Sequence, residues 1–202
     1  MDLSYKTTNI FPISIHSITV NDFHEVKNTL VEDCYNWRKN DPSGRQVSNQ
    51  AGGWQSEYQS LRNMNPILDS TISTSLMNYL PIRKNILFSV GGWLNINPPG
   101  AYNRIHCHPN CHLSGVFWIK SPDKSGNIIF EHPNTFSSFV ENLTYSTKFK
   151  LANNTDHMYS CEPVEGKIII FPSYLNHEVS INESDEDRIS YAFNVNFNLR
   201  DK

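Results

Sequence analysis

Residues 86–130 read ILFSVGGWLNINPPGAYNRIHCHPNCHLSGVFWIKSPDKSGNIIF, and this stretch decides the fold class. Short runs of Ile, Val, Leu and Phe alternate in it with clusters of Gly, Pro, Asn and Ser. Apolar runs that end at such clusters are typical of β-strands. The pattern predicts strands at residues 86–90, 93–97, 104–108, 113–119 and 127–130, with one of the turns at Gly91-Gly92.

The same pattern returns near the C-terminus, at residues 167–171, 177–181 and 189–198. Many short strands joined by polar turns indicate an antiparallel sandwich or barrel. Earlier in the chain, residues 9–20 predict an entry strand. The spacing of apolar residues predicts two helices, one from about residue 21 to 40 and one from about 61 to 79. These helices would cover one face of a sheet.

Composition narrows the possible partners of the chain. The 202 residues fit one domain, and the net charge of −3 comes without any basic block, so no nucleic-acid partner is predicted. The longest apolar runs, such as residues 168–172, have the length of a strand, and no membrane span is expected. The N-terminus, MDLSYKTTNIF, lacks the pattern of a secretory signal.

The sequence contains four cysteines, Cys34, Cys107, Cys111 and Cys161. Their usage favours free thiols in a reducing cytoplasm. Cys107 and Cys111 lie close together among histidines, which leaves zinc as an alternative, although no second close pair accompanies them.

A first chemical motif is the NRIHCHPN segment at residues 103–110. Residues two apart in a strand point to the same side, so His106 and His108 can reach one metal ion. The alternative is that both are surface histidines beside the Pro-Asn turn. A third histidine, His177, opens a predicted strand after the turn-containing FPSYLN segment at residues 171–176, and it is the candidate third ligand.

A further motif, Arg188-Ile189-Ser190, lies on the strand after His177. Arg188 and Ser190 share a face of that strand. A buried guanidinium with a hydroxyl beside it would hold a carboxylate, because its planar fork donates two parallel hydrogen bonds. The alternative is an ordinary salt bridge between Arg188 and one of the neighbouring acids, which are Glu183, Asp185, Glu186 and Asp187.

Together these residues resemble those of the 2-oxoglutarate- and Fe(II)-dependent oxygenases, which include the prolyl hydroxylases, and within them a group from bacteria and phages. The resemblance covers most of the chain, and its segments occur in the expected order. They are IFPISI (10–15), SNQAGGWQS (48–56), WLNINPPG (93–100), HCHPN (106–110), LSGVFWIKSP (113–122), GNIIFEHP (126–133), FPSYLNHEVS (171–180) and RISYAFN (188–194).

This resemblance implies a mainly β fold with flanking helices, a double-stranded β-helix of the jelly-roll, cupin-like kind. We expect a single domain over residues 1–202 with a helical N-terminal part at about 21–80. It also implies an enzyme, a dioxygenase that hydroxylates a small-molecule or peptidyl substrate with dioxygen, Fe(II) and the cosubstrate 2-oxoglutarate.

The resemblance also assigns roles to individual residues. His106, His108 and His177 would bind the iron at the catalytic centre, and Arg188 would hold the C5 carboxylate of 2-oxoglutarate. Ser190 or Tyr102 would assist Arg188, and Asn103 is a candidate for a polar contact to the cosubstrate. The family usually has Asp or Glu at the position of His108, and Glu131 is the alternative source of a carboxylate ligand.

Two other functions are compatible with the same residues. A cupin-like metal enzyme that does not use 2-oxoglutarate would keep the three histidines but would not need Arg188. A non-catalytic β-sandwich that serves as a binding or structural module would need no metal. The segment at residues 48–56 is either a packed turn or a lid on the substrate side.

Overall fold

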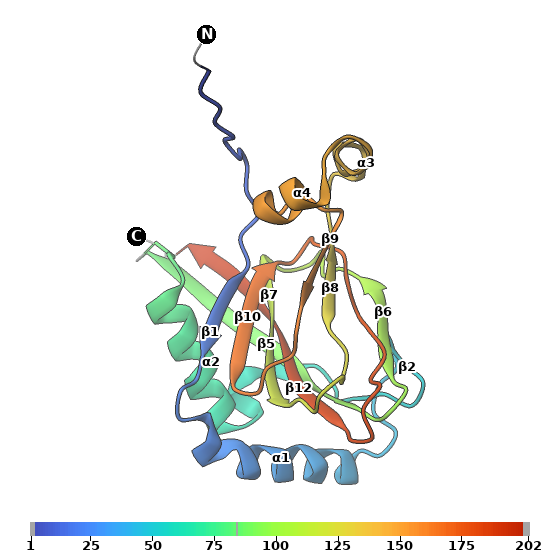
Figure 1. The fold of residues 1–202 in the computed structure, drawn as a ribbon. Helices are drawn as coiled ribbons and strands as arrows, with labels where there is room; N and C mark the ends of the chain where they lie inside the picture. Colours follow the sequence, from blue (N-terminus) through green and yellow to red (C-terminus); the bar gives the residue numbers. More distant parts are fainter. Residues whose placement is uncertain (1–2, 84, 200–202) are drawn as a thin grey trace.

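The computed structural model describes residues 3–83 and 85–199, so residues 1–2, 84 and 200–202 of the predicted domain lie outside the described residues. Two β-sheets face each other, and helices lie against them (Figure 1). All strand pairs in both sheets are antiparallel. This architecture confirms the predicted mainly β fold with flanking helices.

The larger sheet, called the major sheet, consists in spatial order of β1 (His16–Thr19), β10 (Lys167–Pro172), β7 (Leu113–Lys120), β12 (Arg188–Leu199), β5 (Ile86–Asn97) and β3 (Trp54–Gln55), with β4 (Gln59–Ser60) also paired to β5. The minor sheet consists of β2 (Asn49–Gln50), β6 (Tyr102–His106), β11 (His177–Val179), β8 (Ile128–Glu131) and β9 (Met158–Cys161).

Two helices, α1 (Phe23–Asn40) and α2 (Pro66–Tyr79), cover the outer face of the major sheet (Figure 1). Helix α2 follows a short 3₁₀ turn, η1 (Leu61–Asn63), and starts later than predicted. Its start is fixed by Asn65, whose side chain accepts hydrogen bonds from the backbone N–H groups of Ile67 and Leu68. Ile72 and Leu76 in this helix are fully buried in the core beneath the sheet.

Strand β10 shows how the two layers are separated. Its apolar run is buried on both sides, as a strand between two cores must be. Ile168 and Ile170 point into the core under the helices, whereas Ile169 and Phe171 point into the space between the sheets. Phe171 of this inter-sheet core also lines the cavity that holds the candidate site residues His106, His177 and Arg188.

The predicted turn at Gly91-Gly92 was wrong, because β5 runs without a break from Ile86 to Asn97. The glycines permit close packing instead. A Cβ atom at Gly92 would overlap the carbonyl oxygen of Ala192, and one at Gly91 would overlap the ring of Tyr58. The predicted entry strand at residues 9–20 is also shorter in the structure, where it is β1 alone.

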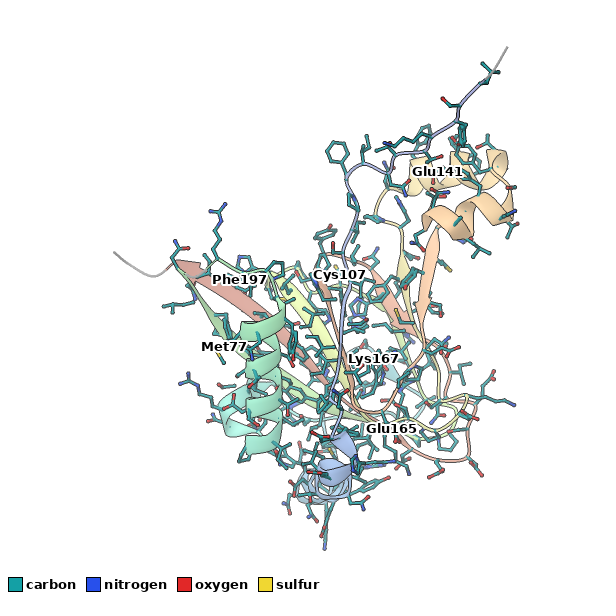
Figure 2. The ribbon with its side chains drawn as sticks, turned by 60° about the vertical axis from the view of Figure 1, so that its left-hand side comes forward. Met77, Cys107, Glu141, Glu165, Lys167 and Phe197 are labelled. Atoms are coloured by element: carbon teal, nitrogen blue, oxygen red, sulfur yellow. The ribbon has the colours of Figure 1, made fainter. Side chains whose placement is uncertain are left out.

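Three elements between β8 and β10 were not predicted. They are α3 (Thr135–Thr144), α4 (Thr147–Asn153) and β9, and the two helices stand at one end of the sheets (Figure 1). Cys107 lies toward this end, whereas Glu165 and Lys167 lie toward the end near α1 (Figure 2). Among the described helices, none combines the length and the apolar character needed to cross a membrane.

Candidate active site

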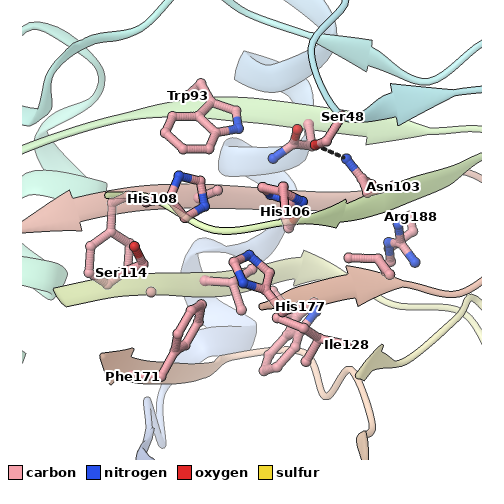
Figure 3. A pocket seen from close by; sticks show the side chains of 18 residues that line it. Ser48, Trp93, Asn103, His106, His108, Ser114, Ile128, Phe171, His177 and Arg188 are labelled. Carbon is pink, nitrogen blue, oxygen red and sulfur yellow. Dashed lines mark hydrogen bonds between the residues drawn. The ribbon is translucent and has the colours of Figure 1, made fainter. Parts of the chain in front are cut away.

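Three histidines meet in a cavity between the sheets (Figure 3). His106 ends β6, His177 opens β11, and these two residues are directly paired across the strands. His108 lies just beyond the end of β6, where its backbone N–H donates to the carbonyl oxygen of Ser173 at 2.9 Å. The candidate ligand atoms of the three side chains all lie within 4.8 Å of one another, so one metal ion can contact all three.

Hydrogen bonds to the backbone orient two of these imidazole rings. His106 Nδ1 lies 2.7 Å from the carbonyl oxygen of Arg104, and His177 Nδ1 lies 2.9 Å from that of Leu175. A carbonyl oxygen only accepts hydrogen bonds, so Nδ1 carries the proton in each ring. The Nε2 lone pair of both histidines is therefore available to a metal.

Burial keeps the three imidazoles neutral. Burial first, and repulsion by the neighbouring histidines second, lower the pKa of His108 to about 4 and that of His177 to about 3. The pKa of His106 is also lowered by burial. Because a metal binds only the neutral ring, these pKa values favour metal binding at neutral pH.

A β-bulge in β6 brings Asn103 into the same cavity as His106. Asn103 pairs with Val179 and His106 pairs with His177, so two residues of β6 lie opposite one of β11. Asn103 and His106 both line the cavity although they are three positions apart. Tyr102, next to Asn103, does not line it, so the prediction that Tyr102 assists Arg188 does not fit its placement.

Arg188 lies at one side of the histidines and is only 3 % exposed (Figure 3). Its Nη1 donates to the carbonyl oxygens of Ser125 and Gly126, and burial lowers its pKa to about 10, so it stays charged at neutral pH. Ser190 follows on the same face of β12 and also lines the cavity.

The predicted alternative, a salt bridge from Arg188 to a neighbouring acid, is wrong within the part of the chain that the structure describes. Glu186 instead pairs with Lys120 at 2.8 Å, and Asp187 lies 3.9 Å from Arg38. A buried cation without a carboxylate partner is costly. The cavity is therefore suited to an anionic ligand.

Several lining residues were not predicted as parts of the site. The Trp93 ring lies 5.6 Å from the His108 ring, measured between centroids. Asn97 donates to Asn103 at 3.1 Å, and Asn103 donates to Ser48 at 3.1 Å, which fixes the Asn103 side chain (Figure 3). Ser48 directly precedes β2, and Trp54 in β3 is buried, so the 48–56 segment is a packed turn with one residue at the cavity.

The two other candidate ligand sets lie outside the histidine cluster. Glu131 follows Phe130, whose ring is buried between the sheets. The Glu131 carboxylate accepts a hydrogen bond from Asn176. Cys107 and Cys111 are free thiols. Within residues 3–83 and 85–199, the cluster of possible metal ligands contains the three histidines and neither a carboxylate nor a thiol.

Gly126 supports Arg188 and gives a first testable prediction. Its φ is +95°, and a Cβ atom there would lie 2.8 Å from Nη1 of Arg188 and would overlap the Ser180 carbonyl oxygen. Gly126→Ala should therefore lower the free energy of unfolding by about 2 kcal/mol or more. Gly100→Ala is the matched control, because φ is +83° there but nothing lies within 4 Å, and it should cost only about 1 kcal/mol. Denaturant unfolding measures both, and equal losses would contradict the prediction.

Residues 91–194 match the sequence model of the family described as "Putative 2OG-Fe(II) oxygenase". A comparison with curated proteins gives no significant match. Residues 91–194 hold every residue that the sequence assigned to the site.

Solved oxygenase structures share the fold. A Pseudomonas putida prolyl-4-hydroxylase has a TM-score of 0.59 at 14 % identity, with 94 % of each chain covered. A 2OG-Fe(II) oxygenase family oxidoreductase from Burkholderia pseudomallei has a TM-score of 0.56 at 12 % identity, covering 90 % of this chain and 85 % of that one. A Trichoplax adhaerens prolyl hydroxylase, in complex with a hypoxia inducible factor peptide, has a TM-score of 0.57 at 12 % identity, covering 89 % and 82 %. These likenesses confirm the double-stranded β-helix.

Proposed function

The chain belongs to the 2OG-Fe(II) oxygenase family, and from this premise we propose that it is a dioxygenase that hydroxylates its substrate. The family depends on Fe(II) and 2-oxoglutarate. One observation carries the proposal: three neutral histidines line the same cavity as a buried arginine that has no carboxylate partner among the described residues. A metal enzyme that does not use 2-oxoglutarate would have no need for this arginine.

The donor set fits Fe(II). Imidazole nitrogen is a suitable ligand for divalent iron, and His106, His108 and His177 would hold it. The backbone carbonyls of Arg104 and Leu175 keep Nδ1 of two of these rings protonated, so Nε2 would be the atom that holds the metal. Three protein ligands leave coordination positions open for other ligands.

The opposite side of the cavity fits 2-oxoglutarate. Arg188 would bind the C5 carboxylate with its guanidinium group, and Ser190 and Asn103 would add polar contacts. When bound, iron and 2-oxoglutarate supply the activation of dioxygen, with 2-oxoglutarate converted to succinate and carbon dioxide and one oxygen atom passed to the substrate. The surrounding chain orients the reactants and excludes water, with Trp118, Ile128 and Phe171 forming apolar walls.

The substrate of this dioxygenase is a small molecule or a peptidyl group. The side of the cavity away from Arg188 is lined by Ser114 and Phe171 (Figure 3), and Val116 and Phe193 also line the cavity. We place the enzyme in the cytoplasm, where reduced iron is available and the four free thiols stay reduced.

Succinate formation tests the proposed function. Anaerobically purified protein is loaded with Fe(II), mixed with 2-oxoglutarate and exposed to air, and succinate is measured without any added substrate. Slow formation of succinate that stops with a chelator is the expected result. Iron-loaded protein that neither binds nor converts 2-oxoglutarate would overturn the proposal.

Metal binding should also have a defined pH dependence. The pKa of each ligand histidine is lowered from 6.5, so the rings are already neutral above that pH and protons do not compete with the metal. Affinity for Mn(II) should therefore stay constant from pH 8 to 6.5 and be lost as the pH approaches about 4, where His108 protonates. Titrations followed by circular dichroism, to check that the chain stays folded, measure this. A loss centred above pH 6.5 would contradict the prediction.

A further inference from the structure

The charge of the cavity carries a further inference, which rests on the proposed function. Arg188 is the one lining residue with a full charge among the described residues, since none of the others is Asp, Glu or Lys. A histidine binds a metal ion as the neutral ring, so the three histidines add no charge of their own. With a divalent ion bound, the cavity would therefore hold three positive charges.

Three carboxylates that are close in the sequence or the strand pairing to the site residues do not offset this charge. Glu178 lies between His177 and Val179, which both line the cavity, so its side chain points to the other face of the strand. Asp187 accepts a hydrogen bond from Tyr35 at 3.0 Å on the side of α1. Glu131 is bound to Asn176.

The cosubstrate leaves one of these charges without a partner. 2-Oxoglutarate is a dianion, so the complex would keep a net charge of +1 beside the apolar core between the sheets. An unbalanced buried charge is strongly unfavourable, and a site that carries one attracts a counter-anion. A carboxylate ligand at the position of His108 would remove this charge, and the structure has an imidazole there.

A hydrogen-bond donor lies beside the uncompensated charge. The Trp93 ring lies over His108, with its nitrogen on the side where His106 lies (Figure 3). Trp93 lines the cavity, and the described part of the chain provides no acceptor for its indole N–H. An indole N–H only donates, so it is suited to an anion.

We propose that His108 and Trp93 make this site selective for a substrate that carries a carboxylate, which binds beside the metal as the third negative charge. Substrates of this class include free carboxylic acids and acidic side chains. A neutral substrate would leave the cavity charge uncompensated and would bind less tightly.

Formate is the probe for this proposal. The protein is loaded with Mn(II), saturated with 2-oxoglutarate under argon, and titrated with ¹³C-labelled formate. Paramagnetic relaxation of the formate carbon then reports whether formate lies close to the metal, independently of turnover. Acetamide labelled at the carbonyl carbon is the neutral control. Competition with chloride tests whether a simple inorganic anion binds at the position of formate.

Saturable relaxation of formate, without loss of 2-oxoglutarate and without a comparable effect on acetamide, is the expected result. His108→Asp adds one negative charge and should weaken formate binding at least about tenfold. Trp93→Phe removes one donor to a charged group and should weaken it about tenfold while metal and 2-oxoglutarate stay bound. Trp93→Phe keeps the test decisive if His108→Asp loses the metal.

Three outcomes would overturn the inference. These are formate that does not approach the metal, formate that only displaces 2-oxoglutarate, and chloride that binds where formate does not. Failure of the proposed function can be distinguished from failure of this inference. If the proposed function is wrong, the protein will not bind Mn(II) or 2-oxoglutarate in the loading steps that precede the formate titration.

Discussion

Replacing His177 by alanine should abolish metal binding and lower 2-oxoglutarate turnover by more than about a hundredfold. Loss of a residue that only orients a metal ligand already costs about 10–100-fold, and loss of a ligand itself costs more. His177 is 4 % exposed, so alanine leaves a hole that the backbone cannot close without moving β11. Mn(II) binding by the purified variant is the direct measurement.

His24→Ala is the matched control for this experiment, because His24 is exposed on α1, away from the cavity. It should bind Mn(II) like the unchanged protein. Circular dichroism of the His177→Ala variant separates loss of the ligand from loss of the fold. A folded His177→Ala protein that still binds Mn(II) with unchanged affinity would show that the three histidines are not the metal site.

Replacing Arg188 by methionine should weaken 2-oxoglutarate binding at least about thirtyfold and leave Mn(II) binding unchanged. Removing one partner of a buried, hydrogen-bonded charge pair costs about 2–5 kcal/mol. Methionine has a similar length, but it cannot donate to a carboxylate. Titration of the Mn(II)-loaded protein with 2-oxoglutarate measures the effect.

Arg188→Lys adds a finer comparison. Lysine keeps the charge but lacks the planar fork, so its affinity for 2-oxoglutarate should lie between those of the original protein and the methionine variant. Arg38→Met is the control on the surface, because the Arg38 side chain is 38 % exposed and lies near Asp187 rather than at the cavity. If the Arg188→Met variant binds 2-oxoglutarate with unchanged affinity, Arg188 does not bind the cosubstrate.

Much of the site could be predicted because its residues follow simple strand rules. His106 and His108 are two positions apart, and Arg188 and Ser190 are two positions apart, so alternation predicts that each pair shares a face. Strand pairing then brings His177 directly opposite His106. Tyr102 and Asn103 were harder to place, because the bulge in β6 changes the alternation and no local sequence signal marks it.

Other features depend on contacts between distant segments. Gly91-Gly92 has the composition of a turn, yet the residues that require glycine there are distant in sequence: Tyr58, just before β4, and Ala192 in β12. Ser48 is polar and lies in a Gly-rich segment, and it reaches the cavity only because β2 pairs with β6. Helix α3 shows an apolar pattern with Phe136, Phe139 and Leu143 exposed, so the packing that usually explains such a pattern is missing.

A crystal structure of the protein with Mn(II) and 2-oxoglutarate, measured at the manganese absorption edge, tests the central claim most directly. We expect one anomalous peak bound by His106, His108 and His177, with the C5 carboxylate of 2-oxoglutarate on the Arg188 guanidinium group. A manganese ion bound elsewhere, or a 2-oxoglutarate molecule that does not contact Arg188, would contradict the account.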